Sequence, residues 1–474
     1  MHSLVKALTF CVLSLSLAGC AQNPVSGKQD FVMMSEAQEI SLGAKEDANV
    51  RKRYKVYEAP ALQDYVNSVG QKIARKSHRP NLRYHFTVLD TSEINAFALP
   101  GGHVYVTRGI LAYLNSEAEL AAVLGHEIGH VTARHGVRQA SAAQVTDVGI
   151  TLMSILVPQI NPNLSQTFAG AILSGYGRDH ELEADRLGAS YLARSTYDPQ
   201  AMIRVIGVLK NQELFDAQVA KQEGREPRRY HGVFATHPDN DTRLQQVVAE
   251  SSQLAMQEPY EGYAAYLRQI DGLVYNGSSE QGVVRNNQFM HAGLGFALAF
   301  PHGWQARNQP DRLILTSPQA DAVMQLTVDK KPRMDPYDYL RNTVSGASTR
   351  DIEALDSHRL PGAVAILPTV MVAAIYLDDR VYILQGKAKT AEVFKTYRPD
   401  MLDSIKSFHA MSQEEKQKAK PLTIRLITSR AGDTYAKLAQ RSPLGNQAEG
   451  YLRLINADYP QGEPRPGQLL KVVE

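Results

Sequence analysis

The sequence predicts an α+β protein whose mainly helical first domain, residues 20–275, carries a small β-hairpin and sheet. It also predicts a small α+β domain over residues 289–408 and a strand-helix-helix-strand module over residues 421–474. Two observations predict this order. Apolar residues recur at helical spacing through most of the first domain, and β-prone runs dominate the second. A length of 474 residues suits two to four domains.

The N-terminal segment, residues 1–19, is typical of a secretory signal, with a weakly basic start and an apolar run over residues 7–17. That run is too short to cross a bilayer, which takes about 20 residues. The sequence Leu-Ala-Gly-Cys ending at Cys20 resembles a bacterial lipobox, so we expect lipidation at Cys20. By the same resemblance, Ala21 favours the outer membrane. A chance cysteine after an ordinary cleaved signal is the alternative.

The segments that follow predict a tether, two helices, a strand and a hairpin. Gly and Pro in residues 22–33 indicate an extended tether. Spacing of apolar residues indicates three further elements: helices over 35–49 and 62–75 and a strand over 84–89. A Pro-Gly-Gly turn separates two β-prone arms and predicts a hairpin over 95–109.

The next predicted helix carries the most informative motif of the chain. Ser116 and Glu119 form a capping pattern ahead of an apolar periodic run. His126 and His130 are four residues apart and therefore share one helix face, with Glu127 beside them. Two nitrogen ligands and a general base beside an open position are what a catalytic zinc needs. The alternative, polar residues on a solvated helix, fits poorly with so apolar a run.

Two neighbouring residues limit this site. His135 lies nine residues after His126, about 180° around a continued helix, so we expect a surface or supporting role for it. Position 136 is Gly, which excludes the three-histidine arrangement and requires a third ligand from elsewhere. Gly129 costs about 1 kcal/mol of helix propensity, so we expect it to allow close packing.

Residues 178–188 predict a helix that offers this third ligand. Glu181 and Asp185 share a face, whereas Glu183 points away. Glu181 would complete a two-histidine, one-glutamate site. Asp185 would orient a ligand or stabilise the transition state. The alternative is that these acids form surface pairs with neighbouring arginines.

Other segments of the first domain give less specific predictions. Residues 145–158 form the longest apolar run after the signal, which fits a lid over the site and a plain core helix equally well. We expect a helix over 199–213, a charged loop over 221–229 and a helix opened by Pro238.

The C-terminal half shows no catalytic constellation. A polar break over 276–288 marks the boundary. In the second domain we predict strands over 296–300, 312–316, 323–328, 370–376 and 380–384, and helices over 335–342 and 397–408. Charged residues 411–420 predict a linker. The Gly-Asp-Thr and Pro-Gly-Gln sequences of residues 421–474 resemble a LysM module, which implies peptidoglycan binding; a module used only for packing fits nearly as well.

Four pieces of the first domain together resemble the HtpX-like and CAAX-prenyl-protease-type zinc metallopeptidases, most closely their periplasmic and lipoprotein members. They are residues 126–135, 181–185, 95–102 and Thr236-His237-Pro238, and the resemblance covers about residues 22–250. It implies a zincin-type fold and one Zn²⁺ held by His126, His130 and Glu181. It also implies catalytic roles for Glu127 and Asp185, and a His237 that approaches the metal, stabilising the oxyanion or closing a latent site.

The resemblance further implies polypeptide substrates in the periplasm, with misfolded or stalled outer-membrane or envelope proteins as the class. Membrane attachment would come through Cys20, and the hairpin would hold substrate backbone at a sheet edge, although a purely structural hairpin fits nearly as well. The chain departs from the membrane members by having no spanning segment, and its C-terminal half does not resemble a helical-repeat domain. A net charge of +2 gives no argument for a nucleic-acid partner. Two alternatives are a chaperone-like protein with a latent metal site and a peptidoglycan-bound scaffold.

Overall fold

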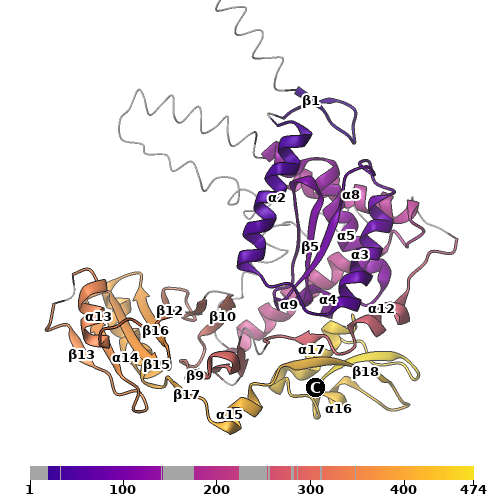
Figure 1. Cartoon of the computed structure of the whole chain (residues 1–474). Coiled ribbons are helices and arrows are strands. Elements are labelled where there is room, and N and C mark those ends of the chain that lie inside the picture. The colour runs from indigo at the N-terminus through magenta and orange to yellow at the C-terminus, as the bar shows by residue number, and fades with distance from the viewer. Residues whose placement is uncertain are drawn as a thin grey trace, which may run out of the picture. The chain divides into compact units, whose positions relative to one another are not determined.

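The computed structural model describes residues 20–32, 34–139, 141, 176–223, 254, 257–278, 282–285, 287–309, 312–346 and 348–474. The predictions for residues 1–19, 145–158, His237 and the helix after it lie outside the described residues. The chain divides into two compact units (Figure 1). Unit 1 comprises residues 1–213, 229–273 and 424–474, and unit 2 comprises residues 214–228 and 274–423. Both mix helices with strands, which confirms the predicted α+β class.

Unit 1 begins with a hairpin where the sequence predicted an extended tether. Strands β1 (Cys20–Gln22) and β2 (Gln29–Phe31) pair antiparallel. The side chain of Asn23 makes this turn, because its Oδ1 accepts hydrogen bonds from the N–H groups of Val25 and Ser26 at 2.8 and 3.0 Å. Such Asx-type turns replace a backbone turn with a side chain.

Two long helices follow, close to where the sequence predicts them. Helix α2 (Glu36–Arg53) begins at Ser35, which forms a full capping box with Gln38. It runs four residues beyond the predicted end at residue 49. Helix α3 (Pro60–Ala74) opens with proline at its first position, where the missing N–H costs nothing. The apolar face of α3 is buried.

A three-stranded sheet has the order β3-β5-β4 and contains the predicted hairpin. Its strands are β3 (His85–Leu89), β4 (Ala96–Leu99) and β5 (His103–Thr107). The turn between β4 and β5 needs glycine, since Gly101 and Gly102 have φ of 76° and 93°. Strand β5 pairs with β3 on one side and β4 on the other. The hairpin therefore presents its edge through β4 and not through the more β-prone β5.

Helix α5 (Glu117–Thr132) carries the His-Glu-Ile-Gly-His motif and starts at Ser116, whose side chain accepts from the Glu119 N–H. Glu119 does not complete a capping box, because its carboxylate instead accepts from the Asn115 N–H at 2.7 Å. Helices α8 (Arg178–Arg194) and α9 (Ala201–Glu223) form where the sequence predicts helices. Helix α8 runs six residues past the predicted end at 188, and α9 runs ten residues past the predicted end at 213, into the start of the predicted charged loop. Two helices were not predicted: α4 (Arg108–Tyr113) and α12 (Tyr263–Ile270).

Unit 2 is built around a seven-stranded antiparallel sheet of order β10-β11-β12-β16-β15-β14-β13. This sheet and a four-stranded sheet together contain eleven strands among the described residues, and five of these were predicted. The eleven strands are β7 (Val283–Arg285), β8 (Gln288–His291), β9 (Phe296–Ala299), β10 (Gln305–Gln309), β11 (Arg312–Thr316), β12 (Ala322–Lys330), β13 (Ile352–Ala354), β14 (Gly362–Ile366), β15 (Val370–Leu377), β16 (Arg380–Ala388) and β17 (His409–Ala410). Strands β17, β9, β8 and β7 form a separate four-stranded sheet.

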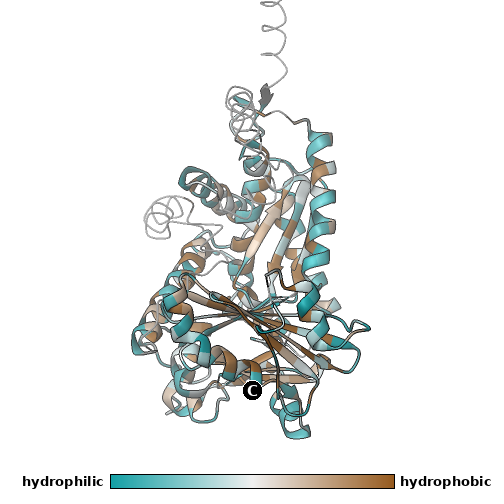
Figure 2. Cartoon of the chain, turned by 90° about the vertical axis from the view of Figure 1, so that its left-hand side faces the viewer, coloured by the Kyte–Doolittle hydropathy of each residue, from teal (hydrophilic) through white to brown (hydrophobic). Residues whose placement is uncertain are grey.

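Two helices cover opposite faces of the seven-stranded sheet. Helix α14 (Ala391–Lys406) packs with Ala373 and Ile375, whereas α13 (Pro336–Thr343) packs with Ala374 and Tyr376. Alternate residues of β15 thus point to opposite faces, as a strand requires. Figure 2 shows hydrophobic residues along these strands.

The C-terminal residues follow the predicted order strand, helix, helix, strand. The elements are β18 (Leu422–Thr428), α16 (Tyr435–Ala439), α17 (Ala448–Ile455) and β19 (Leu469–Val473). Strand β18 lies between β19 and β6 (Val274–Tyr275). Residues 411–420, predicted as a linker, instead contain helix α15 (Gln413–Lys418), because Ser412 and Glu415 form a capping box.

Residues 424–474 of the C-terminal module group with unit 1. Lys471 of β19 is fully buried and donates from Nζ to the Ala112 and Leu114 carbonyls at 2.8 and 2.7 Å. Ala112 lies in the last turn of helix α4, and Leu114 is the residue that caps its C-terminal end. Burial lowers the pKa of Lys471 to about 7, although the nearby Glu119 acts in the opposite direction. Lys471 therefore joins the module to the segment that leads into α5.

We expect Lys471→Ala to lower the free energy of unfolding of unit 1 by about 1–3 kcal/mol, since two buried carbonyls lose a donor. Urea unfolding followed by circular dichroism would show the shift. The single tryptophan, Trp304, lies in the core of unit 2, so its fluorescence should keep the wild-type midpoint. The exposed Lys437→Ala in the same module serves as the control. An unchanged circular dichroism midpoint in Lys471→Ala would contradict this role.

Candidate metal centre

Helices α5 and α8 approach each other closely because Gly129 has no side chain. A Cβ atom at position 129 would lie 2.9 Å from the Ala184 carbonyl oxygen and 3.1 Å from the Ala184 Cα. Contacts this short do not occur in folded proteins without rearrangement. The expectation that Gly129 serves close packing is confirmed. The crossing brings the carboxylates of α8 next to the imidazoles of α5.

The structure brings together His126, His130 and Glu181, whose donor atoms all lie within 4.8 Å of one another. The Nε2 atoms of the two histidines are 3.0 Å apart. Each lies 3.5 Å from one carboxylate oxygen of Glu181. All three side chains are buried. Two imidazole nitrogens and a carboxylate that converge on one point form the donor set of a catalytic zinc site.

Asp185 supports the first histidine. Its Oδ1 lies 2.8 Å from Nδ1 of His126. An ionised carboxylate only accepts hydrogen bonds, so Nδ1 of His126 donates and the lone pair on Nε2 faces His130 and Glu181. Of the two roles predicted for Asp185, this geometry matches that of orienting a ligand.

The electrostatic environment of the cluster favours a cation. Burial acts to lower the pKa of His126, but the carboxylates of Asp185 and Glu181 outweigh it and raise the pKa to about 9. The buried phenol of Tyr176 has a raised pKa for the complementary reason: burial, Glu127 and Glu181 all disfavour its anion. Positive charge is thus stabilised between these side chains and negative charge is not.

His135 lies against the site, and the prediction that placed it on the far side of the helix was wrong. Helix α5 ends at Thr132, and Arg134 has a left-handed φ of 56°. Residues after such a C-terminal turn no longer follow the helical rotation. The ring of His135 is consequently fully buried, with its Nδ1 2.8 Å from Nδ1 of His130. Of the two roles predicted for His135, burial excludes the surface role, and the supporting role stays a prediction.

Buried contacts hold this backbone turn in place. The guanidinium of Arg134 donates to Oε2 of Glu39 at 2.9 Å and to the Met34 carbonyl at 2.9 Å. Glu39 also accepts from Arg79 at 2.7 Å. The cost of a left-handed non-glycine residue is about 1–2 kcal/mol, and these charge-assisted hydrogen bonds offset it.

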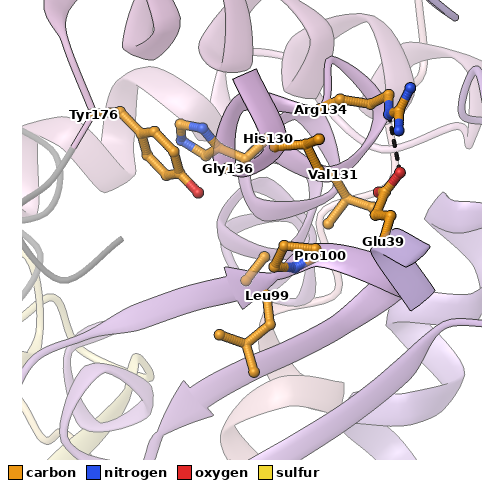
Figure 3. A pocket seen from close by; sticks show the side chains of 10 residues that line it. Glu39, Leu99, Pro100, His130, Val131, Arg134, Gly136 and Tyr176 are labelled. Carbon is orange, nitrogen blue, oxygen red and sulfur yellow. Dashed lines mark hydrogen bonds and ion pairs between the residues drawn. The ribbon is translucent and has the colours of Figure 1, made fainter. Parts of the chain in front are cut away.

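Residues of β4 line two cavities near the histidine pair. Ala98 and Leu99 line the first together with His130 and Tyr176, and Figure 3 shows the Tyr176 ring alongside His130. These two rings stack with centroids 4.1 Å apart. The second cavity lies beside His126 and Glu127 and is otherwise apolar, with these members: Ala96, Ile110, Ala122, Val123, Met202, Val205, Ile206 and Leu209. Strand β4 thus contributes to a cavity beside each of the two histidines.

Sequence reasoning missed Tyr176 and the position of His135. Tyr176 stands just before α8 with no motif around it, so no local signal singles it out. For His135, Gly136 was the only nearby sign that the helix ends. The left-handed residue is Arg134, a type that rarely takes this conformation.

We expect Gly129→Ala to weaken metal binding and to lower the free energy of unfolding by about 1–3 kcal/mol. The added Cβ forces α8, with Glu181 and Asp185, away from α5. Helix propensity alone would stabilise the variant by about 1 kcal/mol. Thermal unfolding with and without zinc would measure both effects. Gly207→Ala is the matched control, since a Cβ at position 207 meets nothing within 4 Å. Equal behaviour of the two variants would contradict the close-packing account.

Two histidines and a glutamate on crossing helices, with Glu127 beside the first histidine, define the class of metallopeptidases. Residues 60–251 match the model of Peptidase family M48. These residues are therefore similar to the peptidase domain of that family.

Similar proteins carry the names of metallopeptidases. The chain is 30% identical over 294 residues to the beta-barrel assembly-enhancing protease of Escherichia coli (strain K12), covering 59% of this chain and 58% of that protein. It is 32% identical over 243 residues to the protein of the same name from Yersinia pestis, covering 49% and 47%. It is 33% identical over 129 residues to the mitochondrial metalloendopeptidase OMA1 of Arabidopsis thaliana, covering 27% and 26%. The chain thus spans about half the length of its bacterial relatives or less.

Proposed function

We propose that this chain is a zinc-dependent metalloendopeptidase that cleaves polypeptides in the bacterial periplasm. The observation that carries the proposal is the buried cluster of His126, His130 and Glu181, with Glu127 on the same helix. The match of residues 60–251 to the model of Peptidase family M48 and the names of the relatives support peptide hydrolysis. The donor set of two nitrogens and one oxygen supports zinc over the harder cations, which prefer oxygen ligands alone.

Each residue has a distinct task in the proposed reaction. A zinc ion at this position would act as a Lewis acid and lower the pKa of water toward about 7. Glu127 accepts the proton of the attacking water and passes it to the leaving amine. Asp185 holds His126 in the tautomer that binds metal. His237 is proposed, by resemblance alone, to stabilise the developing oxyanion or to occupy the open position in a latent state.

We propose that the substrate backbone adds to the edge of β4. Among the described residues no strand pairs with the outer edge of β4. Peptides bind such edges through main-chain hydrogen bonds, with alternate side chains entering pockets. The apolar cavity beside Glu127 would then receive an apolar side chain next to the scissile bond.

The cellular role is proposed from the relatives and the N-terminal sequence. The name of two relatives, beta-barrel assembly-enhancing protease, supports misfolded or stalled outer-membrane or envelope proteins as substrates. Lipidation at Cys20 would anchor the chain to the outer membrane. None of the described helices is long and apolar enough to span a membrane. The strand-helix-helix-strand order of residues 422–473 supports a peptidoglycan contact as well, which binding of the full chain to purified sacculi would test.

The direct test of the proposal measures zinc content and proteolysis together. The full chain should bind about one zinc ion and cleave casein, and chelation should stop cleavage until zinc is restored. A chain that binds zinc without cleaving any polypeptide would favour a chaperone-like protein with a latent site. A chain that binds no zinc would refute the proposal.

A further inference from the structure

We propose that His135 and Glu183 form a hydrogen-bonded relay that orients His130 for metal binding, so that each histidine ligand is backed by its own carboxylate. His135 is a positioning residue in this relay and does not touch substrate or metal. The inference rests on the proposed zinc site and goes beyond it by assigning two residues outside the ligand set.

The outer step of the relay joins His135 to Glu183 of α8. Nε2 of His135 lies 3.0 Å from Oε2 of Glu183. A carboxylate offers only lone pairs, so the proton in this contact sits on Nε2 of His135. Nη1 of Arg138 donates to the same oxygen at 3.3 Å, so Oε2 of Glu183 accepts from both side chains.

The inner step follows from the first. A neutral imidazole that carries its proton on Nε2 has a lone pair on Nδ1. The Nδ1 atoms of His135 and His130 are 2.8 Å apart, so His130 must supply the proton of this hydrogen bond. His130 is then protonated on Nδ1, and its Nε2 lone pair points toward Nε2 of His126 and the carboxylate of Glu181. The metal-binding tautomer of His130 is thus fixed by the carboxylate of Glu183, which is two hydrogen bonds away through His135.

The same logic holds for the other histidine, over a shorter path. Asp185 fixes the tautomer of His126 directly at 2.8 Å, whereas Glu183 fixes that of His130 through His135. Both carboxylates come from α8, and neither is a member of the metal-binding cluster. Both arms place the proton on Nδ1 of the histidine and direct the Nε2 lone pair toward the cluster.

A stacked ring packs against each imidazole of the relay, and the planes of His130 and His135 are 72° apart. His180 stacks on His135 with centroids 4.3 Å apart, and Tyr176 stacks on His130 at 4.1 Å. Water has little access to compete for the hydrogen bonds, because His130 and His135 are both buried. The outer end lies nearer the surface, where Arg138 also approaches Asp30 of β2 at 3.5 Å.

The test measures zinc affinity by competition with a chelator, in the full chain and without any protein substrate. We expect His135→Leu to weaken zinc binding about 10–100-fold, the usual effect of removing such a partner. His135→Asn should rescue most of the loss, because its amide oxygen takes the position of Nδ1 and accepts from His130. The zinc affinity of Glu183→Gln should lie between those of His135→Leu and His135→Asn. Asp179→Asn is the matched control, since it removes the same charge from an exposed position of the same helix.

Wild-type affinity in His135→Leu, or equal losses in Asp179→Asn and Glu183→Gln, would overturn the relay. If wild type binds zinc and cleaves casein in these cases, only the relay fails. If wild type binds no zinc, the proposed function fails with it. Should His135→Leu not fold, nitrogen-15 NMR of the zinc-loaded wild type decides. Protons on Nε2 of His135 and Nδ1 of His130 support the relay, and the opposite tautomers overturn it.

Discussion

Replacing Glu127 with Gln should lower casein cleavage by at least about 10²–10⁴-fold, the range for loss of a general base, while the chain keeps its zinc. The amide has nearly the shape of the carboxylate but cannot accept the proton of the attacking water. Glu127 is not one of the three cluster donors, so metal binding does not depend on its charge. Initial cleavage rates and zinc per chain would be measured on the same preparations.

Zinc content is the internal control of this experiment. A Glu127→Gln chain without zinc would have lost activity for the wrong reason and would place Glu127 among the ligands. Cleavage near the wild-type rate in a zinc-loaded variant would refute the role of Glu127 as the base. A second control is the exposed Glu58→Gln, which should cleave as wild type does.

Replacing Glu181 with Ala should remove most of the stabilisation that zinc gives to the fold. Two imidazoles alone hold zinc more weakly than two imidazoles and a carboxylate. A ligand that binds only the native state adds about 2.7 kcal/mol of stability when it is present at 100 times its dissociation constant. Wild type should show such a gain on adding zinc, and Glu181→Ala should show little at the same concentration. Thermal unfolding with and without zinc would measure the difference.

Two further variants separate ligation from support. Glu181→Gln keeps the shape of the side chain but offers only a weaker neutral oxygen, so it should also lose most of the gain. Asp185→Asn removes a supporting contact only, and its loss of affinity should be the smaller, about 10–100-fold. If zinc stabilised the Glu181→Ala chain against unfolding as much as it stabilises wild type, the third ligand would lie elsewhere.

The elements that local chemistry specifies could be predicted. Ser116 caps α5 through its own hydroxyl, and the Pro-Gly-Gly turn needs the positive φ that Gly101 and Gly102 supply. Helical spacing put His126 and His130 on one face, and the same reasoning put Glu181 and Asp185 together on α8. The pairing of these two helices was inferred from chemistry, because only a shared metal gave them a reason to meet.

What could not be predicted depends on contacts between distant residues. Arg134 takes a left-handed conformation because Glu39, far away in sequence, binds its guanidinium. The rotation of His135 toward His130 follows from that contact, so no local pattern contains it. Lys471 is likewise an ordinary lysine in sequence, yet it joins the C-terminal module to α4.

In unit 2 the missed strands have weak patterns of their own. Strand β10 reads Gln-Ala-Arg-Asn-Gln, and it is half-buried throughout at the edge of the sheet. Its pairing with β11 along five residue pairs stabilises the strand, although its side chains show no apolar alternation. Residues 411–420 were predicted as a linker from their charge, although their capping residues were visible. Charge alone does not distinguish a solvated helix from an irregular segment.

Zinc K-edge X-ray absorption of the zinc-loaded full chain tests the central claim most directly. The claim is that one ion is held by His126, His130 and Glu181. The account predicts two imidazole nitrogens at about 2.0–2.1 Å and carboxylate oxygen at about 2.0–2.2 Å. It also predicts that Glu181→Ala changes the spectrum. A sulfur ligand at about 2.3 Å, or a spectrum with no imidazole contribution, would contradict it.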